Sequence, residues 1–283
     1  MMKDEVFLIA EIGINHNGSL DIATNLIDLA IKYGWNAVKL QKRNVRKVIP
    51  KSMWNKPKET PWGEMPYIEY KERLEFGKDE YDFIDEYCKL KGINWFASAW
   101  DLESQEFLRQ YDLKYNKIAS PMITYRPLLE MVASEGKLTF ISTGMATWKD
   151  IDKAVKIFKR EKCPFVLMHC VGTYPAKDEE LNLSLIPKLA KRYKCEVGYS
   201  CHNPGVLPAA LAVVYGARYI EKHITLDRTM WGSDQAASLE PHGMELVRKY
   251  CDAALKMIGD GKKRILEKER EIAKKLRYWE VKE

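Results

Sequence analysis

Eight short runs rich in β-branched and aromatic residues alternate with longer amphipathic stretches along this chain. The eight candidate strands cover residues 6–12, 37–41, 95–99, 115–119, 139–143, 166–171, 196–200 and 219–225. The helical patterns cover residues 20–33, 78–91, 104–111, 126–135, 149–160, 183–192, 206–215 and 244–258. Strands that alternate with helices predict a parallel sheet, and eight such units are typical of a closed barrel. We therefore predict an α/β fold of the TIM (β/α)8 barrel class.

The length of 283 residues is large for one ordinary domain but normal for a single barrel of this class. We expect residues 1–260 to form the barrel and residues 261–283 to form a charged helical tail. An insertion, residues 42–77, follows the second strand and is too long for a plain strand-to-helix loop. Because such loops often carry function, we expect the insertion to form part of the site.

The charge and cysteine content favour a soluble cytoplasmic protein that binds small molecules. The net charge of +6 is modest, and the basic runs at residues 262–264 and 274–277 lie in a segment rich in both signs. Such a segment is typical of a solvated helix and not of a nucleic-acid surface. The chain has no apolar run of about 18 residues, which a membrane helix needs, and its first residues lack a signal-peptide core. Six scattered cysteines without a Cys-x-x-Cys pair favour a reducing cytoplasm.

Two histidines end successive strands near the end of the predicted barrel. His202 follows the strand at 196–200, and His223 lies within the strand at 219–225. Parallel strands joined by one helix are neighbours, so the two imidazoles should converge at the carboxyl ends, where barrels of this class carry their active sites. Neutral imidazole is the commonest metal ligand, which makes this pair a candidate metal site.

Two lysines and a glutamate are expected inside the mouth of the same barrel. Alternation along the strand places Lys39 and Gln41 on the inward face, and Lys117 ends the fourth strand. Two uncompensated ammonium groups repel each other unless an anion such as phosphate or carboxylate holds them together. The alternative is that each lysine pairs with an internal acid. Glu11 ends the apolar first strand, where it is either functional or part of a salt bridge within the barrel.

Further polar residues follow the other strands. Glu221 shares the inward face with His223, whereas Lys222 takes the opposite face. Asp234 lies in a Gly-Ser-rich loop and either covers the site or only forms a turn. His169 is a possible third ligand or a hydrogen-bonded wall residue. The polar side chains at or after the strand ends that are candidates for contact with a substrate are Gln41, Ser120, Thr143, Tyr174, Ser200, Glu221 and Asp234. A metal, an anion cradle and a carboxylate base suit carbon–carbon bond formation with phosphoenolpyruvate.

These residues lie in motifs that resemble the sialic acid synthase (NeuB-type) family between about residues 5 and 260. The motifs are Glu11-Ile-Gly-Ile-Asn-His-Asn-Gly18, Val38-Lys-Leu-Gln41, Phe76-Gly-Lys, Trp95-Phe-Ala-Ser-Ala-Trp-Asp101, Lys117-Ile-Ala-Ser120, Ser142-Thr-Gly-Met145, His169-Cys-Val and Glu221-Lys-His-Ile-Thr225. The resemblance implies condensation of phosphoenolpyruvate with N-acetylmannosamine or a related sugar to give a nonulosonic acid. Together with the composition, we expect a cytoplasmic enzyme that binds neither nucleic acid nor a membrane, and the resemblance makes a homodimer one expected assembly.

The resemblance assigns roles where the motifs match. His202 and His223 match the metal ligands, with manganese as the expected ion and magnesium or cobalt as alternatives. Glu11 matches a glutamate that activates water or assists proton movement. The positions that hold phosphoenolpyruvate match Lys39, Lys117, Ser120, Thr143 and Ser200, and those near the sugar hydroxyls match Gln41, Tyr174 and Asp234.

The chain departs from the family pattern in three places. The usual Tyr-Ser-Asp-His-Thr reads Tyr199-Ser-Cys-His-Asn203, and the usual Pro-Asp-His reads Ser233-Asp-Gln235. We also expect the chain to lack the C-terminal antifreeze-like domain, which in the family contributes to the sugar pocket of the partner subunit. The insertion at 42–77 and the tail are the candidates to close the pocket instead, and the acceptor sugar stays open.

Two other functions fit parts of this pattern. A Schiff-base aldolase would use Lys39 or Lys117 to attack pyruvate before addition to a sugar aldehyde. A non-catalytic barrel would only bind a sugar, but the presence of Glu11, both lysines and both histidines argues against it.

Overall fold

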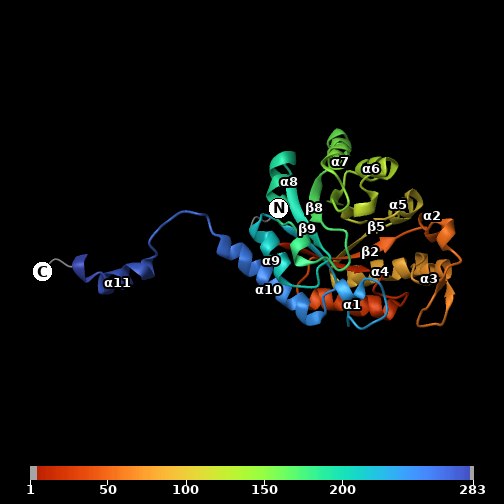
Figure 1. Cartoon of the computed structure of the whole chain (residues 1–283), viewed down its shortest axis with the longest axis horizontal. Coiled ribbons are helices and arrows are strands. Elements are labelled where there is room, and N and C mark those ends of the chain that lie inside the picture. The colour runs from red at the N-terminus through yellow and green to blue at the C-terminus, as the bar shows by residue number, and fades with distance from the viewer. Residues whose placement is uncertain (1–4, 281–283) are drawn as a thin grey trace.

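A closed barrel of eight parallel strands forms the centre of the molecule (Figure 1). The computed structural model describes residues 5–280. The barrel strands are β1 (Phe7–Gly13), β2 (Ala37–Lys42), β5 (Asn94–Ala99), β6 (Tyr115–Ile118), β7 (Leu138–Ser142), β8 (Phe165–Cys170), β9 (Glu196–Cys201) and β10 (Tyr219–His223). They neighbour one another in chain order, and β10 closes the ring against β1. The predicted (β/α)8 barrel is confirmed.

Eight helices surround these strands and cover their outward faces (Figure 1). They are α1 (Leu20–Lys32), α4 (Lys78–Lys91), α5 (Leu102–Leu108), α6 (Arg126–Ala133), α7 (Trp148–Arg160), α8 (Leu185–Tyr193), α9 (Leu207–Val214) and α10 (Pro241–Ile258). The local sequence explains where two of these helices begin. The Ser19 side chain accepts a hydrogen bond from the backbone N–H of Ile22 at the start of α1, and the Asp101 side chain accepts one from the backbone N–H of Ser104 at the start of α5. These caps fix the helix starts directly after the strand-to-helix loops.

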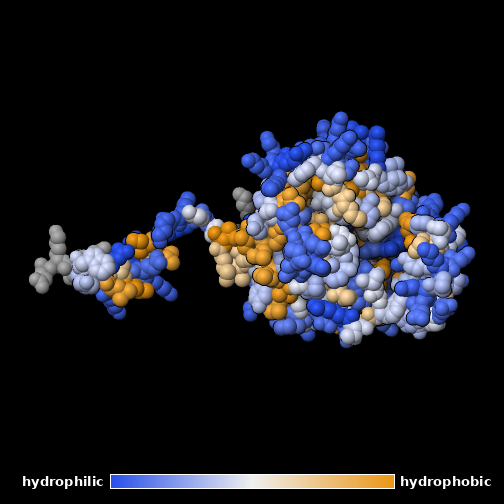
Figure 2. All heavy atoms as spheres, in the orientation of Figure 1, coloured by the Kyte–Doolittle hydropathy of each residue, from blue (hydrophilic) through white to orange (hydrophobic). Residues whose placement is uncertain are grey.

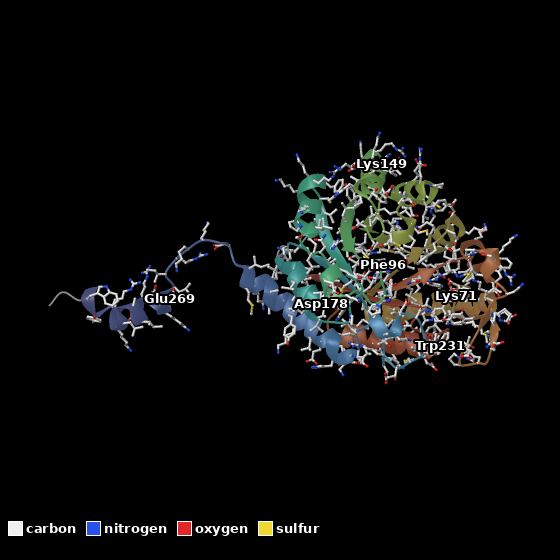
Figure 3. All side chains as sticks on the ribbon, in the orientation of Figure 1. Lys71, Phe96, Lys149, Asp178, Trp231 and Glu269 are labelled. Atoms are coloured by element: carbon white, nitrogen blue, oxygen red, sulfur yellow. The ribbon has the colours of Figure 1, made fainter. Side chains whose placement is uncertain are left out.

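Aromatic rings fill the amino-terminal end of the barrel. The ring centroids of Phe7 and Tyr115 lie 5.4 Å apart, and those of Phe140 and Tyr219 lie 5.3 Å apart. Phe96, labelled within the barrel in Figure 3, packs against Phe140 with their ring centroids 5.6 Å apart. Because these rings take up the inward positions at this end, the polar inward positions lie toward the carboxyl ends of the strands.

The insertion after β2 folds into a small group of helices and strands beside the barrel mouth. It contains α2 (Val45–Val48), η1 (Lys51–Met53), a hairpin of β3 (Pro57–Lys58) and β4 (Met65–Pro66), and α3 (Tyr67–Arg73). Tyr70 and Leu74 of this segment form a buried cluster with Ile14, and Trp231 packs against it. The insertion therefore rests on the loops that follow β1 and β10, beside the site.

The C-terminal segment lies apart from the barrel (Figure 1). Helix α11 (Glu267–Leu276) has no buried residue, and Figure 2 shows apolar side chains on it. Within one chain, the tail therefore does not cover the barrel mouth. Among the described residues, no helix combines the length and apolar character needed to cross a membrane.

Candidate active site

A polar cavity lies at the carboxyl ends of the barrel strands. Ten of the twelve residues predicted for the site line it: Glu11, Lys39, Gln41, Lys117, Ser120, Tyr174, Ser200, His202, Glu221 and His223. Residues outside the predicted set also line it, among them Ser98, Trp100, Ser142, Met145 and Cys170. The sequence had placed these side chains on separate strands, and closure of the barrel brings them together.

Two glutamates neutralise the two lysines of the cavity. Lys39 Nζ lies 2.7 Å from Glu11 Oε2 and 3.6 Å from Glu221 Oε1, and Lys117 Nζ lies 3.0 Å from Glu221 Oε2. Strand register explains the first contact, because Glu11 is paired with Lys39 on β2, whereas Glu221 on β10 reaches Lys117 on β6 across the barrel. The expectation of two uncompensated ammonium groups was wrong, and the alternative of pairing with internal acids holds.

These neighbouring charges shift the pKa values of Glu221, Lys39 and Lys117. Burial disfavours the carboxylate of Glu221, but Lys117 and Lys39 outweigh it and lower its pKa to about 2. Burial also disfavours the ammonium of Lys39, yet Glu11 and Glu221 together raise its pKa. For Lys117, burial outweighs the attraction of Glu221, and its pKa is lowered. Glu221 therefore stays ionised between the two lysines at neutral pH.

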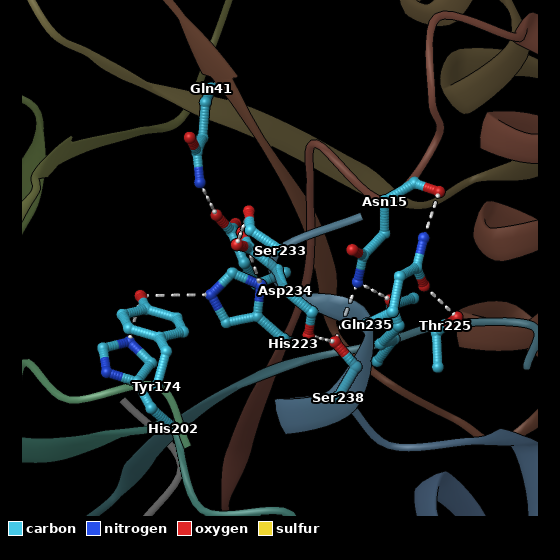
Figure 4. Close-up of polar contacts among 12 residues, drawn as sticks. Asn15, Gln41, Tyr174, His202, His223, Thr225, Ser233, Asp234, Gln235 and Ser238 are labelled. Carbon is cyan, nitrogen blue, oxygen red and sulfur yellow. Dashed lines mark hydrogen bonds and ion pairs between the residues drawn. The ribbon is translucent and has the colours of Figure 1, made fainter. Parts of the chain in front are cut away.

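The two histidines converge on a single point at the cavity edge (Figure 4). His202 Nε2 lies 2.6 Å and His223 Nε2 lies 3.4 Å from the hydroxyl of Tyr174. His202 Nδ1 lies 2.6 Å from the carbonyl oxygen of Val171. A proton on Nδ1 is donated to that oxygen, which leaves the lone pair of Nε2 directed into the site. Burial, with a smaller effect of His223, lowers the pKa of His202 to about 3, so its ring is neutral.

These imidazoles fit a divalent metal ion. Metal-binding histidines commonly donate their second ring nitrogen to a backbone carbonyl, as His202 does to Val171. The buried Nδ1 of His223 has no hydrogen-bond partner and lies 3.8 Å from Asp234 Oδ2. Among the described residues, no group of three or more His, Cys, Asp or Glu side chains could hold a metal ion. A bound ion would thus have two protein ligands and several positions open for substrate or water.

Comparisons with known proteins show which family this chain belongs to. A family model described as the NeuB family matches residues 26–263. The chain belongs to the NeuB family. It is 35% identical over 270 residues to an uncharacterized protein of Methanocaldococcus jannaschii, a match that covers 95% of this chain and 77% of that protein. It is 36% identical over 246 residues to the N-acetylneuraminate-9-phosphate synthase of Homo sapiens, covering 86% of this chain and 68% of the human protein.

A solved structure from the same family shows the same architecture. The crystal structure of an N-acetylneuraminic acid (sialic acid) synthetase from Leptospira borgpetersenii superposes with a TM-score of 0.85 at 34% identity. The match covers 98% of this chain and 94% of that one. The predicted membership of the NeuB-type family is therefore confirmed.

Two residues predicted for the NeuB-type site do not line the cavity. The Thr143 hydroxyl donates to the carbonyl oxygen of Met168 at 3.1 Å, which turns it toward β8. Its neighbour Ser142 lines the cavity instead and accepts a 2.6 Å hydrogen bond from Lys117 Nζ. Alternation from the inward Phe140 would have selected Ser142. Asp234 lies beside His223, at the edge of the cavity.

Several polar residues of the family motifs have structural roles here. His169 Nε2 lies 2.7 Å from the carbonyl oxygen of Leu181, outside the cavity, so His169 is a wall residue and not a third ligand. Gln235, which replaces the usual histidine, donates to the carbonyl oxygen of Asn15 at 3.3 Å. It therefore ties the loop after β10 to the loop after β1.

Gly13 sits where the NeuB-type site leaves no room for a side chain. Its φ of +55° is a conformation that favours glycine. A Cβ atom here would lie 3.2 Å from Gln41 Nε2 and from His223 Cε1, and 3.3 Å from Glu11 Oε1. A side chain at residue 13 would therefore press on Gln41, His223 and Glu11 together.

Replacing Lys222 with methionine is expected to weaken both the fold and the metal site. The buried ammonium group of Lys222 donates to the carbonyl oxygens of Asn203 and Gly205, both at 2.6 Å, directly after His202. Loss of these bonds leaves two carbonyls without donors and should lower the free energy of unfolding by about 2–4 kcal/mol. Because the loop also orients His202, metal affinity should fall by about 10–100-fold.

Urea unfolding and metal titration measure these two effects. Lys188→Met removes an exposed lysine from α8 and is the matched control. Native metal affinity in Lys222→Met would contradict the positioning role of Lys222 while leaving its structural role intact.

His16 should make the stability of the protein depend on pH. Its ring is buried, stacks on Phe76 at 3.9 Å and accepts a hydrogen bond from the Gly18 N–H at 3.1 Å. Burial, with a smaller effect of Arg43, lowers its pKa to about 3. Between pH 6.5 and 3 the unfolded chain binds a proton at this position that the folded chain does not, so stability falls as the pH falls.

Urea unfolding of metal-free protein between pH 6 and 4.5 tests this expectation. His16 should contribute a slope approaching about 1.4 kcal/mol per pH unit, and His16→Asn should remove it. An unchanged slope in His16→Asn would show that the folded protein protonates this ring as readily as the unfolded chain.

Proposed function

We propose that this chain condenses phosphoenolpyruvate with an aldose to form a nonulosonic, sialic-type acid and releases phosphate. The acceptor class is N-acetylmannosamine or a related hexosamine or hexose. One observation carries the proposal: a single cavity brings two convergent histidines together with a Lys39–Glu221–Lys117 charge chain. The names of the human and Leptospira relatives support a synthase of this kind.

The lysines and hydroxyls would bind the anionic groups of phosphoenolpyruvate. Lys39 and Lys117 are buried beside Glu11 and Glu221, whose carboxylates favour the charged form of each lysine. Ser120 and Ser200 line the same cavity and offer hydroxyl donors to phosphate or carboxylate oxygens. Fixed donors of this kind hold C3 of the enol in position to attack an aldehyde carbon.

The histidines, Tyr174 and Asp234 would bind the acceptor side of the reaction. His202 and His223 would hold a divalent ion, which we expect to be manganese, with magnesium or cobalt as alternatives. Such an ion, when bound, polarises the aldehyde oxygen of the sugar. Tyr174, Gln41 and Asp234 surround this point and can exchange hydrogen bonds with sugar hydroxyls.

Glu11 is the proposed proton carrier. Its carboxylate accepts a 2.9 Å hydrogen bond from Gln41 and lies 2.7 Å from Lys39 Nζ. Attack by C3 leaves C2 electron-poor, and water adds there while Glu11 takes its proton. The resulting tetrahedral carbon then expels phosphate by cleavage of its C–O bond, which leaves the keto group of the product.

A Schiff-base aldolase is the second candidate, because burial lowers the pKa of the Lys117 amine. A lowered pKa favours the neutral amine that attacks pyruvate. Borohydride reduction in the presence of pyruvate, followed by mass spectrometry of the intact protein, separates the two functions. The proposed synthase should show no adduct, should lose activity in EDTA and should regain it with manganese. A stable adduct at Lys117 or Lys39 would favour the aldolase.

A further inference from the structure

A second cleft lies between α6 and α7, on the outside of the barrel. The two helices lie side by side (Figure 1), and the cleft between them has a volume of about 500 Å³. Clefts of this size commonly bind small molecules. Among the described residues, none lines both this cleft and the polar cavity at the barrel mouth. The proposed condensation therefore leaves the α6–α7 cleft without a role.

Three apolar side chains form the floor of the α6–α7 cleft. Leu129 on α6 and Ile157 on α7 are 2% and 8% exposed, and Ile123, in the loop before α6, is 2% exposed. They are the most buried of the lining residues, so they lie deepest in the cleft. Because these side chains belong to the packed core, the floor is a fixed apolar surface that can accept a flat ring.

Four cations line the rim of the α6–α7 cleft. Arg126 lies on α6, and Lys153, Lys156 and Arg160 lie on α7. The two residues after Lys153 follow it at three and seven positions, a spacing that places all three on one side of a helix. One acid, Asp150, lines the cleft with them. The lining residues therefore carry an excess of three positive charges.

The two lysines of the rim have no ion-pair partner, whereas the two arginines do. Glu130 Oε1 lies 3.0 Å from Arg126 Nε and 3.1 Å from Arg160 Nη2, so it holds one guanidinium group from each helix. Within residues 5–280, no carboxylate oxygen lies within 4.0 Å of Lys153 Nζ or Lys156 Nζ. Figure 2 shows hydrophilic side chains gathered over α7 and α8. The two ammonium groups are thus available to an anion.

Two loops connect the α6–α7 cleft with the cavity at the barrel mouth. The first loop runs from Ser120, which lines the cavity, to Ile123, which lines the cleft. The second runs from Ser142 in the cavity to Asp150 in the cleft. The backbone N–H of Gly144 donates to the hydroxyl of Ser120 at 3.2 Å, which joins the two loops. A ligand in the cleft would therefore contact both segments that carry cavity hydroxyls.

We propose that the α6–α7 cleft binds a nucleoside diphosphate or triphosphate, and that this ligand changes the reaction at the barrel mouth through the two loops. The flat face of a base suits the apolar floor, and the guanidinium plane of Arg126 can stack on a base. The phosphates suit Lys153 and Lys156, and ribose hydroxyls can donate to Asp150. The binding stands apart from the proposed condensation, whereas the effect on the reaction rests on it.

Calorimetric titration of the full chain in metal-free buffer tests the binding. The probes are ADP, CDP, GDP and UDP, with inorganic pyrophosphate as a ligand that has two phosphates but no base. At least one nucleotide should bind in a 1:1 ratio, about tenfold or more tightly than pyrophosphate. The double variant Lys153→Gln/Lys156→Gln should weaken this binding by about tenfold or more, because both ammonium groups are lost.

Lys149→Gln is the matched control, because Lys149 is an exposed lysine of α7 that does not line the cleft. This variant should bind the nucleotide as the wild type does. No binding of any nucleotide, equal affinity for pyrophosphate, or unchanged affinity in the double variant would overturn the proposed site. Equal weakening in Lys149→Gln would show general attraction to a basic helix and would overturn it as well.

Phosphate release from phosphoenolpyruvate tests the link to the barrel mouth. A saturating nucleotide should change kcat/KM for phosphoenolpyruvate by about threefold or more in the wild type, and it should have no effect in the double variant. Nucleotide binding without such a change would overturn the link between the sites and leave the cleft as a binding site. Absence of turnover under every condition would overturn the condensation and the link that rests on it, while the calorimetry would still decide the site.

Discussion

His202→Asn and His223→Asn are each expected to lower kcat/KM by about a thousandfold or more, because a metal that polarises a carbonyl contributes several kcal/mol to the reaction. The geometric reason is the convergence of the two Nε2 atoms, which lie 2.6 Å and 3.4 Å from one hydroxyl oxygen. With one imidazole replaced, the ion would keep a single protein ligand. Metal content after dialysis, measured by inductively coupled plasma mass spectrometry, should fall together with activity.

His169→Asn is the matched control for this experiment. His169 is also a buried histidine on a barrel strand, but its ring nitrogen contacts the carbonyl oxygen of Leu181 and lies outside the cavity. This variant should retain its metal, even where its stability is reduced. Full metal content in both His202→Asn and His223→Asn would contradict the assignment of the metal ligands.

Glu221→Gln is expected to affect stability and activity at once. The substitution removes the carboxylate that lies 3.0 Å from Lys117 and 3.6 Å from Lys39. Breaking a buried ion pair by removing one partner costs about 3–5 kcal/mol, because the other charge stays buried without compensation. Lys39 keeps Glu11, so Lys117 should lose the most, and its pKa should fall further. Urea unfolding gives the stability, and phosphate release per folded molecule gives the activity.

Glu135→Gln separates the two effects. Glu135 is a carboxylate whose side chain is only 9% exposed, and it accepts hydrogen bonds from Gln105, Asn116 and Arg109 outside the cavity. Its loss should reduce stability but leave the activity of the folded protein unchanged. Wild-type stability of Glu221→Gln would contradict the account of Glu221 as the anion that keeps two lysines buried.

The period-two alternation of the strands predicted much of the site. It placed Lys39 and Gln41 inward on β2 and separated Glu221 from Lys222 on β10, and the structure agrees at each position. Glycine at residue 13 and the short acids and hydroxyls at helix starts are local signals of the same kind. Each of these features depends on residues that are close together in the sequence, so a single sequence is enough to predict it.

Contacts between strands that are far apart in the sequence could not be predicted from such local patterns. Which acid neutralises Lys117 depends on how β10 and β6 face each other across the closed barrel, 104 positions apart in the chain. For the same reason the sequence could not show that the Thr143 hydroxyl is taken by Met168 or that Arg43 packs on Trp100. The insertion had no periodic pattern strong enough to reveal its hairpin and its contact with Trp231.

Product formation from phosphoenolpyruvate tests the central claim most directly. The purified protein with manganese, phosphoenolpyruvate and a panel of free and phosphorylated aldoses should release one phosphate for each phosphoenolpyruvate consumed, only when a suitable aldose is present. Mass spectrometry should then detect an acid with three carbons more than the sugar. Phosphate release without such a product, or no release with any aldose, would contradict a nonulosonic acid synthase.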